Sequence, residues 1–547
     1  LTPDTIDHLR KLHPVATESM GDLPDDAFAI GVVDAQQLDR ILHHRVHNGS
    51  TPGRSGMTGS HLVAAWDAAS PDGRLGFQLL IRDICNGVFV GEVKQRLLAS
   101  VLIPLSKANG GVRPIAVAET LLRTASFYMM SLLEDDMAAF FPRIQFGVEL
   151  AGGSEAAAHL TRAELAHAGS KCADIIALKI DFRNAFNAIL RRRVWAALRS
   201  HPKAAVLLRA FHWQYSDPSS LLVFDRSGHR FAELLSTEGV RQGCPFAAFA
   251  FALTVQSLYE AALDQTRIPN SCHGFSIQDD FTIVGPYDEV MRVYDYLEQH
   301  AHVDLGLELV TAKCQVFLPP TTTTAVEVVD AIHTACADRG LAHDTRMESL
   351  GVMFGPHAEI VAHVDSAVDD SAHFFRCLTH PSMHVQTASL LLRSCALPKL
   401  SYLTRTTHPD LLLAPARRFD QMALDALKTI LHLHGADTFT RLESQTSDPD
   451  CHIHDPMTDG FDGTDATPPS GSQPRTSTSR LTYCCCCCCC CSCCSSSGSM
   501  ITSVNVSLCT ITGIQRLQRY HCHPGGLSDD VAAASQRLPS SPARGAN

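Results

Sequence analysis

Three carboxylates at the ends of apolar strands constrain this chain more than any other feature of its sequence. Asp181 directly follows the apolar run 175–180, and Asp279-Asp280 separate two further short apolar runs. Adjacent residues of a regular strand point to opposite faces, so these two aspartates converge only if a tight turn breaks the alternation. We therefore predict a β-hairpin whose turn brings Asp279 and Asp280 close to Asp181.

Carboxylates grouped in this way are typical of a site that transfers a nucleotidyl group with two metal ions. Such a site holds Mg²⁺ ions about 3.5–4 Å apart, and each ion completes its octahedron with water and phosphate oxygens. Each pattern alone has a simpler explanation, because an Asp pair often forms a solvated turn and an Asp after a strand often caps a helix. The order of the surrounding segments decides between the two interpretations.

Strands and helices alternate along the chain before a helix-rich C-terminal part. Helices are predicted within 1–100 and over 186–200, 246–258, 288–300 and 360–435, and β-hairpins over 101–117, 221–235 and 274–284. The apolar helix 246–258 is too short for a membrane span, so we expect it to be a buried core helix. This order predicts an α+β core followed by an all-helical domain.

The composition narrows the class of protein. The net charge is −12, and residues 441–547 hold 7 Lys and Arg against 9 Asp and Glu, which leaves −10 for the body. An acidic body argues against a basic nucleic-acid coat protein and predicts weak, salt-sensitive unaided binding to polyanions. Ten of the 21 cysteines lie between positions 484 and 494, which is not a disulfide framework and fits a reducing compartment. We predict that 441–547 is a disordered, low-complexity tail.

An ordered set of motifs extends from the predicted hairpin over 101–117 to the segment at 350–355. These are Ile-Pro-Leu-x-Lys and Gly-Gly-Val-Arg-Pro-Ile within 103–115, Gln-Phe-Gly at 145–147, Asp-Phe-Arg-Asn-Ala-Phe at 181–186, Gly-Val-Arg-Gln-Gly-Cys-Pro-Phe at 239–246, Ile-Gln-Asp-Asp at 277–280, Leu-Gly-Leu-Glu-Leu from 305 through Lys313-Cys314, and Leu-Gly-Val at 350–352 with Gly355. In this order and spacing, residues from about 50 to 430 resemble a reverse transcriptase of a non-LTR, LINE-like and site-specific retrotransposon. The sequence departs from that family at Ile277, where an aromatic residue is usual.

The resemblance implies a right-hand polymerase with fingers, an antiparallel-sheet palm and a helical thumb. The expected divisions are an N-terminal helical extension at 1–100, fingers at 101–174, a palm with the catalytic motifs at 175–320, a primer-grip turn and helical thumb at 321–440, and the tail at 441–547. Full elements also carry an endonuclease and nucleic-acid-binding fingers, so we expect this chain to be a fragment or a decayed copy of one.

The resemblance also implies the roles of individual residues. Asp181 and Asp279 would bridge the metal ions, and Asp280 would assist near the primer terminus. Phe186 would stack under the incoming sugar and exclude a 2′-OH, unless it is a plain core aromatic. The remaining nucleotide-binding residues would be Lys107 and Arg113, which hold the triphosphate, together with Phe182, Gln242 and Gly243.

Two basic groups near these motifs are left open. Lys313 would donate a proton to the leaving pyrophosphate, or would be a solvated lysine at a helix end. Arg191-Arg192-Arg193 would contact template phosphates, or would form a solvated helix face.

The activity implied is RNA-directed DNA polymerisation with Mg²⁺, which Mn²⁺ can replace. The implied partners are an RNA template, a DNA primer or nicked target DNA, and dNTPs, with no membrane, and the implied location is nuclear. An inactive or domesticated nucleic-acid-binding relic is the alternative, favoured by the cysteine run. A viral RNA polymerase would carry Ser-Gly and Gly-Asp-Asp, whereas Gln242-Gly243 and Gln278-Asp279-Asp280 indicate reverse transcription. A group II intron maturase shares only the palm motifs.

Overall fold

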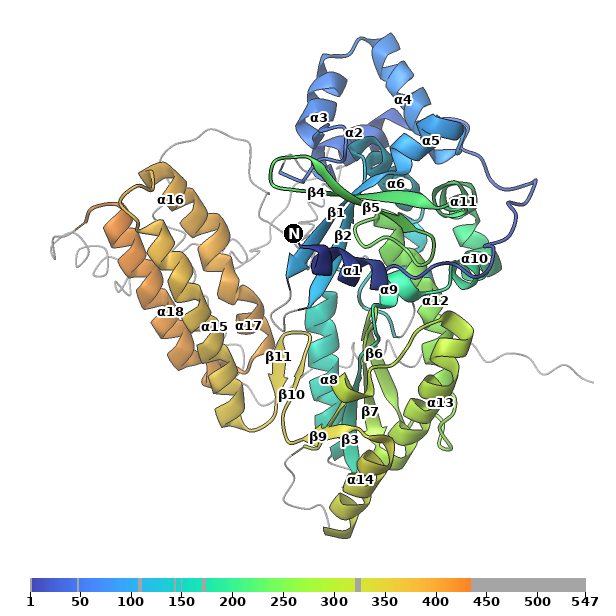
Figure 1. The fold of residues 1–547 in the computed structure, drawn as a ribbon. Coiled ribbons are helices and arrows are strands. Elements are labelled where there is room, and N and C mark those ends of the chain that lie inside the picture. The colour runs from blue at the N-terminus through green and yellow to red at the C-terminus, as the bar shows by residue number, and fades with distance from the viewer. Residues whose placement is uncertain are drawn as a thin grey trace, which may run out of the picture.

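The computed structural model of this protein describes residues 2–46, 49–106, 111–141, 144–148, 150–169, 174–319 and 326–433. This part of the chain has the expected α+β right-hand fold, with fingers, a palm built on a sheet, and a helical thumb (Figure 1). Lys107 and the tail 441–547 lie outside the described residues, so what the sequence predicts for them stays a prediction.

The palm is built on a five-stranded sheet with the strand order β6-β7-β3-β8-β9. Its strands are β3 (Ile175–Ile180), β6 (His273–Ile277), β7 (Asp280–Pro286), β8 (Gln315–Phe317) and β9 (Ala342–Asp344). The first four pair antiparallel, and β9 adds parallel to β8. The predicted strand before Asp181 and the predicted hairpin around Asp279 are both confirmed.

Both faces of the palm sheet are covered by helices. These are α8 (Gly153–Gly169), α12 (Pro245–Leu263) and α13 (Tyr287–Leu305). Ile176, Leu178 and Ile180 of β3 belong to the main core with residues of α12 and α13, whereas Ile175 and Ala177 belong to a second core with residues of α8. Strand alternation therefore sends alternate side chains of β3 into different cores.

Helix α12 is the core helix that the sequence predicts, and it is longer than predicted. Phe246, Phe249 and Phe251 on this helix are each at most 1% exposed. It is the one helix among the described residues that is long and apolar enough to cross a membrane, and 67% of its most apolar window is buried inside the structure.

The fingers are built on a second sheet with the strand order β2-β1-β4-β5. Its strands are β1 (Ser100–Ser106), β2 (Val112–Val117), β4 (Ser219–Phe224) and β5 (Arg230–Ser236). The hairpin of β1 and β2 is as predicted, and it pairs Leu105 with Arg113. Strand β4 lies parallel to β1, with Ser100 opposite Leu221. The hairpin of β4 and β5 lies within the sequence range expected for the palm, but its strands belong to the fingers sheet.

Helices of the N-terminal third surround the fingers sheet (Figure 1). They are α1 (Pro3–Lys11), α2 (Ala35–His44), α3 (Gly59–Ala68), α4 (Pro71–Cys85), α5 (Gly91–Leu98), α6 (Thr120–Ser131) and α7 (Met137–Phe140), with a 3-10 turn at Glu134–Asp136. The helical character predicted for 1–100 is confirmed. Helix α1 packs Ile6 and Leu9 into a small core with Leu102, Ala116 and Leu221 of the fingers strands.

The helix predicted over 186–200 is interrupted, which corrects that prediction. Helix α9 (Ala185–Ala188) ends before Ile189, and α10 (Arg191–Ser200) starts afresh. The backbone N–H of Leu190 donates to the carbonyl of Leu305, 2.9 Å away. A contact with a distant helix end therefore takes the place of a helical hydrogen bond. The segment continues through a 3-10 turn (Pro202–Leu207) to α11 (Leu208–Tyr215).

The thumb is a helical bundle with a core of its own. It is preceded in the chain by the 3-10 turn Thr311–Lys313, α14 (Val326–Arg339) and the hairpin of β10 (Met347–Ser349) and β11 (Val352–Phe354). The bundle itself comprises α15 (His357–Leu378), α16 (Val385–Leu391), a π turn (Leu392–Ala396), a 3-10 turn (Leu397–Leu400), α17 (Ser401–Thr406) and α18 (Pro409–Ile430). In Figure 1 the bundle stands to one side of the fingers and palm. The apolar stripe predicted there is interrupted, because Leu392 is buried but Leu390 is 56% exposed.

Candidate active site

The turn between β6 and β7 carries Asp279 and Asp280. Ile277 pairs with Asp280, so Gln278 and Asp279 are the two central residues of the turn. Gln278 has φ +60°, and Asp279 is not among the residues with positive φ. A positive φ at the first central position alone is the pattern of a type II′ hairpin turn, whose twist matches that of the flanking strands.

Asp181 lies opposite this turn. Strand β3 pairs with β7 so that Ile180 faces Phe281, and one further step of this register sets Asp181 opposite Asp280. Both positions fall on the sheet face that is also occupied by Ala177 of β3 and Val284 of β7. Asp181 and the Asp279-Asp280 pair, which lie far apart in sequence, are therefore neighbours, as the sequence predicts.

The aspartates influence one another electrostatically. Burial, followed by the charges of Asp280 and Asp181, raises the pKa of Asp279 to about 7, while the Arg113 guanidinium opposes that rise. The pKa of Asp280 is also raised, first by loss of surrounding water and then by Asp181, while Lys179 and Arg113 lower it. Carboxylates that are crowded in this way repel one another, and a bound cation relieves the repulsion.

The donor set fits a divalent metal ion. The Asp181 side chain is 31% exposed, yet its Oδ1 atom is buried and makes no hydrogen bond among the described residues. Among the described residues it forms an ion pair with Lys313, whose Nζ lies 3.6 Å away. A hard carboxylate oxygen without a hydrogen bond, facing two further carboxylates, is a suitable ligand for Mg²⁺ or Mn²⁺.

A tighter cluster of metal-type ligands lies elsewhere, at Asp39, His43 and Asp67. Their ligand atoms all lie within 4.8 Å of one another, and among the described residues no other group of three meets this criterion. The aspartates of the palm thus stand further apart, as like charges do. In the N-terminal cluster both ring nitrogens of His43 face carboxylates, at 3.6 Å and 3.3 Å. A hydrogen bond to the Asp39 carbonyl raises the pKa of His43, burial opposes that rise, and the carboxylates of Asp39 and Asp67 add to it, so these partners favour the protonated ring.

The two phenylalanines of the first palm motif have different environments. Phe182 is 6% exposed and stacks in the core with Tyr259, at 6.5 Å between ring centroids. Its ring is therefore part of the core, and its role in nucleotide binding stays a prediction. Phe186 is half-buried and stacks on the fully buried ring of Phe251 at 4.6 Å and 12°. A half-buried ring that is stacked on Phe251, close to Asp181 in sequence, suits the predicted role under the sugar.

Gln242 and Gly243 lie in a turn that rests on the fingers hairpin. The carbonyl of Gln242 accepts a hydrogen bond from the backbone N–H of Ala116 in β2, at 2.8 Å. Gly243 has φ +116°, and a Cβ atom there would lie 2.6 Å from the Ala116 carbonyl oxygen. Only glycine fits this contact, which joins the second palm motif to the strand that carries Arg113.

The Gly243→Ala variant is expected to lower stability by about 2–4 kcal/mol, because it adds a clash to an unfavourable backbone conformation. Gly228→Ala is the matched control, since Gly228 has φ +79° but open space around its Cβ position. We expect the control to lose only about 1–2 kcal/mol. Thermal unfolding of both variants measures the difference, and equal losses would contradict a close contact with Ala116.

The comparisons with known proteins agree with this geometry. Residues 105–354 match the family model described as "Reverse transcriptase (RNA-dependent DNA polymerase)". Residues 105–354 are a reverse transcriptase domain. The chain is also 29% identical over 262 residues to "Retrotransposable element SLACS 132 kDa protein" of Trypanosoma brucei gambiense, covering 48% of this chain and 21% of that protein. It thus spans about a fifth of the length of this relative. The resemblance to a retrotransposon reverse transcriptase is confirmed.

Solved structures similar to this chain include two telomerases. The apo telomerase of Candida tropicalis, truncated from its C-terminal domain, matches with a TM-score of 0.36 and 12% identity, over 49% of this chain and 55% of that one. Telomerase of Candida albicans with a TWJ fragment of telomeric RNA matches with a TM-score of 0.35 and 11% identity, over 62% of each chain.

Two buried arginines stabilise the second motif of the reverse transcriptase domain. One is Arg191 of α10, and the other is Arg241 within the motif itself. Arg191 is 5% exposed and donates to the carbonyls of Gly239, Tyr215 and Ser236 at 2.8–3.1 Å. Arg241 is 3% exposed and donates to the Leu98 carbonyl at 3.0 Å. Both guanidinium groups lie over the ring of Tyr215, at 5.2 Å and 4.8 Å. Arg191 therefore neither contacts template phosphates nor lies on a solvated face, which corrects both expectations for this residue.

The two arginines that follow Arg191 are partly exposed and form ion pairs instead. Arg192 pairs with Glu18 at 2.7 Å, and Arg193 lies 3.9 Å from Asp304, both at partly exposed positions. The sequence identifies the second motif, but it does not indicate that Arg191 and Arg241 support this motif through buried hydrogen bonds. The apolar residues Ile189 and Leu190 before Arg191 are the one sequence signal for its burial, and the two arginines after it point the other way.

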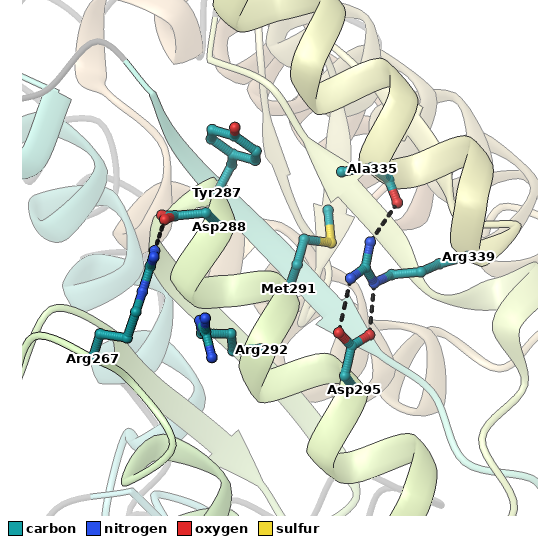
Figure 2. Close-up of a pocket in the computed structure, with 8 residues that line it drawn as sticks. All are labelled: Arg267, Tyr287, Asp288, Met291, Arg292, Asp295, Ala335 and Arg339. Atoms are coloured by element: carbon teal, nitrogen blue, oxygen red, sulfur yellow. Dashed lines mark hydrogen bonds and ion pairs between the residues drawn. The ribbon is translucent and has the colours of Figure 1, made fainter.

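A cavity of about 370 Å³ between α13 and α14 is separate from the aspartates. In Figure 2 four of its charged side chains form two pairs, Arg267 with Asp288 and Arg339 with Asp295. Asp288 follows the end of β7, whereas Asp280 begins that strand, so the two ends stand about 20 Å apart. The cavity marks a junction between α13 and α14 and lies outside the candidate site.

Proposed function

We propose that this chain is an RNA-directed DNA polymerase that extends a DNA 3′ end on an RNA template. The observation that supports it best is the meeting of Asp181 with the Asp279-Asp280 turn on one face of the palm sheet. The same proposal includes an RNA template and a DNA primer, dNTPs as substrates, and nicked target DNA as the natural primer. The polymerase would act in the nucleus on RNA of its own element.

Asp181, Asp279 and Asp280 would hold Mg²⁺, or Mn²⁺ in its place. The bound ions would supply charge neutralisation on the transferred phosphoryl group and lower the pKa of the attacking hydroxyl. The chain's own residues do the positioning. Arg113, whose charge reaches both Asp279 and Asp280, lies on the fingers hairpin where it would bind the triphosphate through its forked donors.

Lys107, which follows β1 in the sequence, would complete the triphosphate site. Gln242, held by the fingers through Ala116, would contact the incoming nucleotide, and Gly243 allows the close approach. Lys313, 3.6 Å from Asp181, stands where a cation offsets the carboxylates before the metal ions bind. Phe186, which is half-buried, would stack under the sugar, and Phe182 would support the backbone beneath Asp181.

Primer extension tests the proposal directly. The full chain is incubated with poly(rA), oligo(dT), dTTP and Mg²⁺ or Mn²⁺, and Asp279→Ala is run beside it. Extension by the parent and none by the variant is the expected result. A folded parent that binds primer–template without extending it would instead support the inactive, nucleic-acid-binding relic.

The Phe186→Ala variant is expected to accept ribonucleotides. Removal of the ring opens space for a 2′-OH, so the ratio of dTTP to rUTP incorporation should fall by roughly 10- to 200-fold, the range typical of one steric contact. Incorporation of dTTP itself should change little. Phe182→Leu is the control, because its buried ring should affect stability and both sugars equally. An unchanged ratio in Phe186→Ala would contradict the sugar-gate role.

A further inference from the structure

Gln278, the residue before Asp279, has an unfavourable backbone conformation. Its φ of +60° lies in the left-handed region, which costs a non-glycine residue about 1–2 kcal/mol. Asp279 follows directly, so the orientation of the Gln278 peptide groups sets the direction of the Asp279 carboxylate. A strained turn at this position persists only if the surrounding structure holds it.

Both peptide groups of Gln278 are held by buried side chains. Gln145 Oε1 accepts a hydrogen bond from the Gln278 N–H at 2.7 Å and a second one from the Gly147 N–H at 2.9 Å. On the other side, the hydroxyls of Ser276 and Tyr259 donate to the Gln278 carbonyl, at 2.8 Å and 3.2 Å. The turn therefore has no backbone group free to reorient at Gln278.

The three side chains also support one another. Gln145 Nε2 donates to the Ser276 Oγ at 3.3 Å, so the Ser276 hydroxyl accepts from Gln145 and donates to Gln278. Gln145 is 5% exposed, and Ser276 and Tyr259 are 0% exposed. The amide of Gln145 has one orientation here, because its oxygen faces two N–H donors. Hydrogen bonds of this kind cannot be replaced by water, so they are costly to break.

Gln145 reaches the turn from a remote part of the chain. The segment containing Gln145 lies along the outer edge of β6. There Phe146 N donates to Ser276 O at 2.7 Å, and Ser276 N donates to Ile144 O at 2.8 Å. The fit is close, since a Cβ on Gly147 would meet Gln145 Oε1 at 2.8 Å. This edge is thus occupied by a segment that supplies a side chain to the turn.

We propose that Gln145, Ser276 and Tyr259 form a clamp that fixes the Gln278 peptide groups and thereby aims Asp279 at the metal ions. Gln145 is then a positioning residue, since it acts through the turn and does not touch the ions. This inference rests on the proposed function of the same site. It deepens that proposal by assigning the metal affinity of the site to a segment outside the palm motifs.

The test is Mn²⁺ binding to the full chain, measured by electron paramagnetic resonance, for the parent and for Gln145→Met. Loss of a supporting hydrogen bond typically weakens a metal site by about 10- to 100-fold, and we expect a weakening in this range. Gln256→Met is the control, because this buried glutamine bonds only within its own helix, to Glu260. It should bind Mn²⁺ as the parent does.

A double variant separates aiming of the turn from general damage. Glycine adopts the left-handed conformation freely, so adding Gln278→Gly to Gln145→Met should restore at least half of the lost affinity on a logarithmic scale. In primer extension, Gln145→Met should need about tenfold more Mg²⁺ for half-maximal rate, with the KM for dTTP within about twofold of the parent. A merely structural role would lower the melting temperature and leave the Mg²⁺ dependence unchanged.

The outcomes distinguish this inference from the proposed function. Equal Mn²⁺ affinity in the parent and Gln145→Met overturns the clamp, even if the parent extends primers. Weaker binding in Gln145→Met supports it, even if the parent extends none. A parent that binds Mn²⁺ no better than Asp279→Ala overturns both. If Gln145→Met does not fold, Tyr259→Phe replaces it, since it removes one hydroxyl and keeps the ring stack on Phe281 at 4.1 Å.

Discussion

Asp279→Asn is expected to be inactive in primer extension and more stable than the parent at pH 8 in the absence of divalent metal. The loss of activity should reach on the order of a thousandfold, equivalent to about 4 kcal/mol of transition-state stabilisation. The gain in stability has a separate origin. Burial and the charges of Asp280 and Asp181 raise the pKa of Asp279 to about 7, so the folded protein disfavours the ionised form of this residue.

The sign of the pH dependence follows from proton binding. An unfolded chain has an Asp pKa of about 3.9, so between that value and about 7 the folded state holds more protons at Asp279 than the unfolded state. The contribution of Asp279 to the free energy of unfolding therefore falls as the pH rises through this window, and it is constant above and below it. The linkage sets an upper limit of about 4 kcal/mol, and we expect about 2–4 kcal/mol in favour of Asp279→Asn at pH 8.

Thermal unfolding at pH 4 to 8 measures this effect, with the two proteins converging near pH 4. Mg²⁺ should stabilise the parent by about 2.7 kcal/mol at a hundred times its dissociation constant, and should stabilise Asp279→Asn much less. Glu348→Gln is a suitable control, because its side chain is exposed and lies outside the aspartate group. A parent that is more stable than Asp279→Asn at pH 8 without metal would contradict the raised pKa.

Arg191→Met is expected to lower the free energy of unfolding by about 3–5 kcal/mol, the cost of removing one partner from a buried charged network. Burial lowers the pKa of Arg191 to about 10, so the guanidinium stays protonated at neutral pH and binds its backbone carbonyls as a cation. Without it, carbonyls of Gly239, Tyr215 and Ser236 would remain buried without a donor.

Arg193→Met is the matched control, two residues away on the same helix. Its side chain is 42% exposed and its ion pair with Asp304 spans 3.9 Å, so a loss within about 0.5 kcal/mol is expected. For a domain of this size the Arg191 variant should melt about 6–15 °C lower. Equal melting temperatures for the two variants would show that Arg191 is solvated, and a lower salt dependence of nucleic-acid binding would indicate the phosphate contact that its burial excludes.

Local sequence signals predicted the parts of this fold that depend on local chemistry. Asn109-Gly110-Gly111 between alternating apolar residues predicted the fingers hairpin, and the short runs around Asp279 predicted the palm hairpin, as the pairing confirms. The meeting of Asp181 with that hairpin was predicted from the grouping of carboxylates at strand ends, and the pairing of β3 with β7 brings it about. The roles of the individual residues stay predictions.

What could not be predicted depends on partners far away in the sequence. Arg191 belongs to an Arg-Arg-Arg run typical of a solvated helix face, and its acceptors lie 24 to 48 residues further on. Gln145 meets Gln278 across 133 residues. The helix around Ile189 breaks because Leu190 bonds to Leu305, and nothing within the helix itself signals the break. In each case a tertiary contact overrides a local preference.

The central position of β3 in the palm sheet has a consequence for synthesis of the chain. Strand β3 leaves the ribosome first, but its two neighbours, β7 and β8, begin only at Asp280 and Gln315. At roughly 5–20 residues per second, the apolar run Ile175–Ile180 waits on the order of 5–20 s for its first partner. A nascent chain stalled before Asp280 exposes both edges of this strand at once, so we expect such truncated products to aggregate or to depend on chaperones.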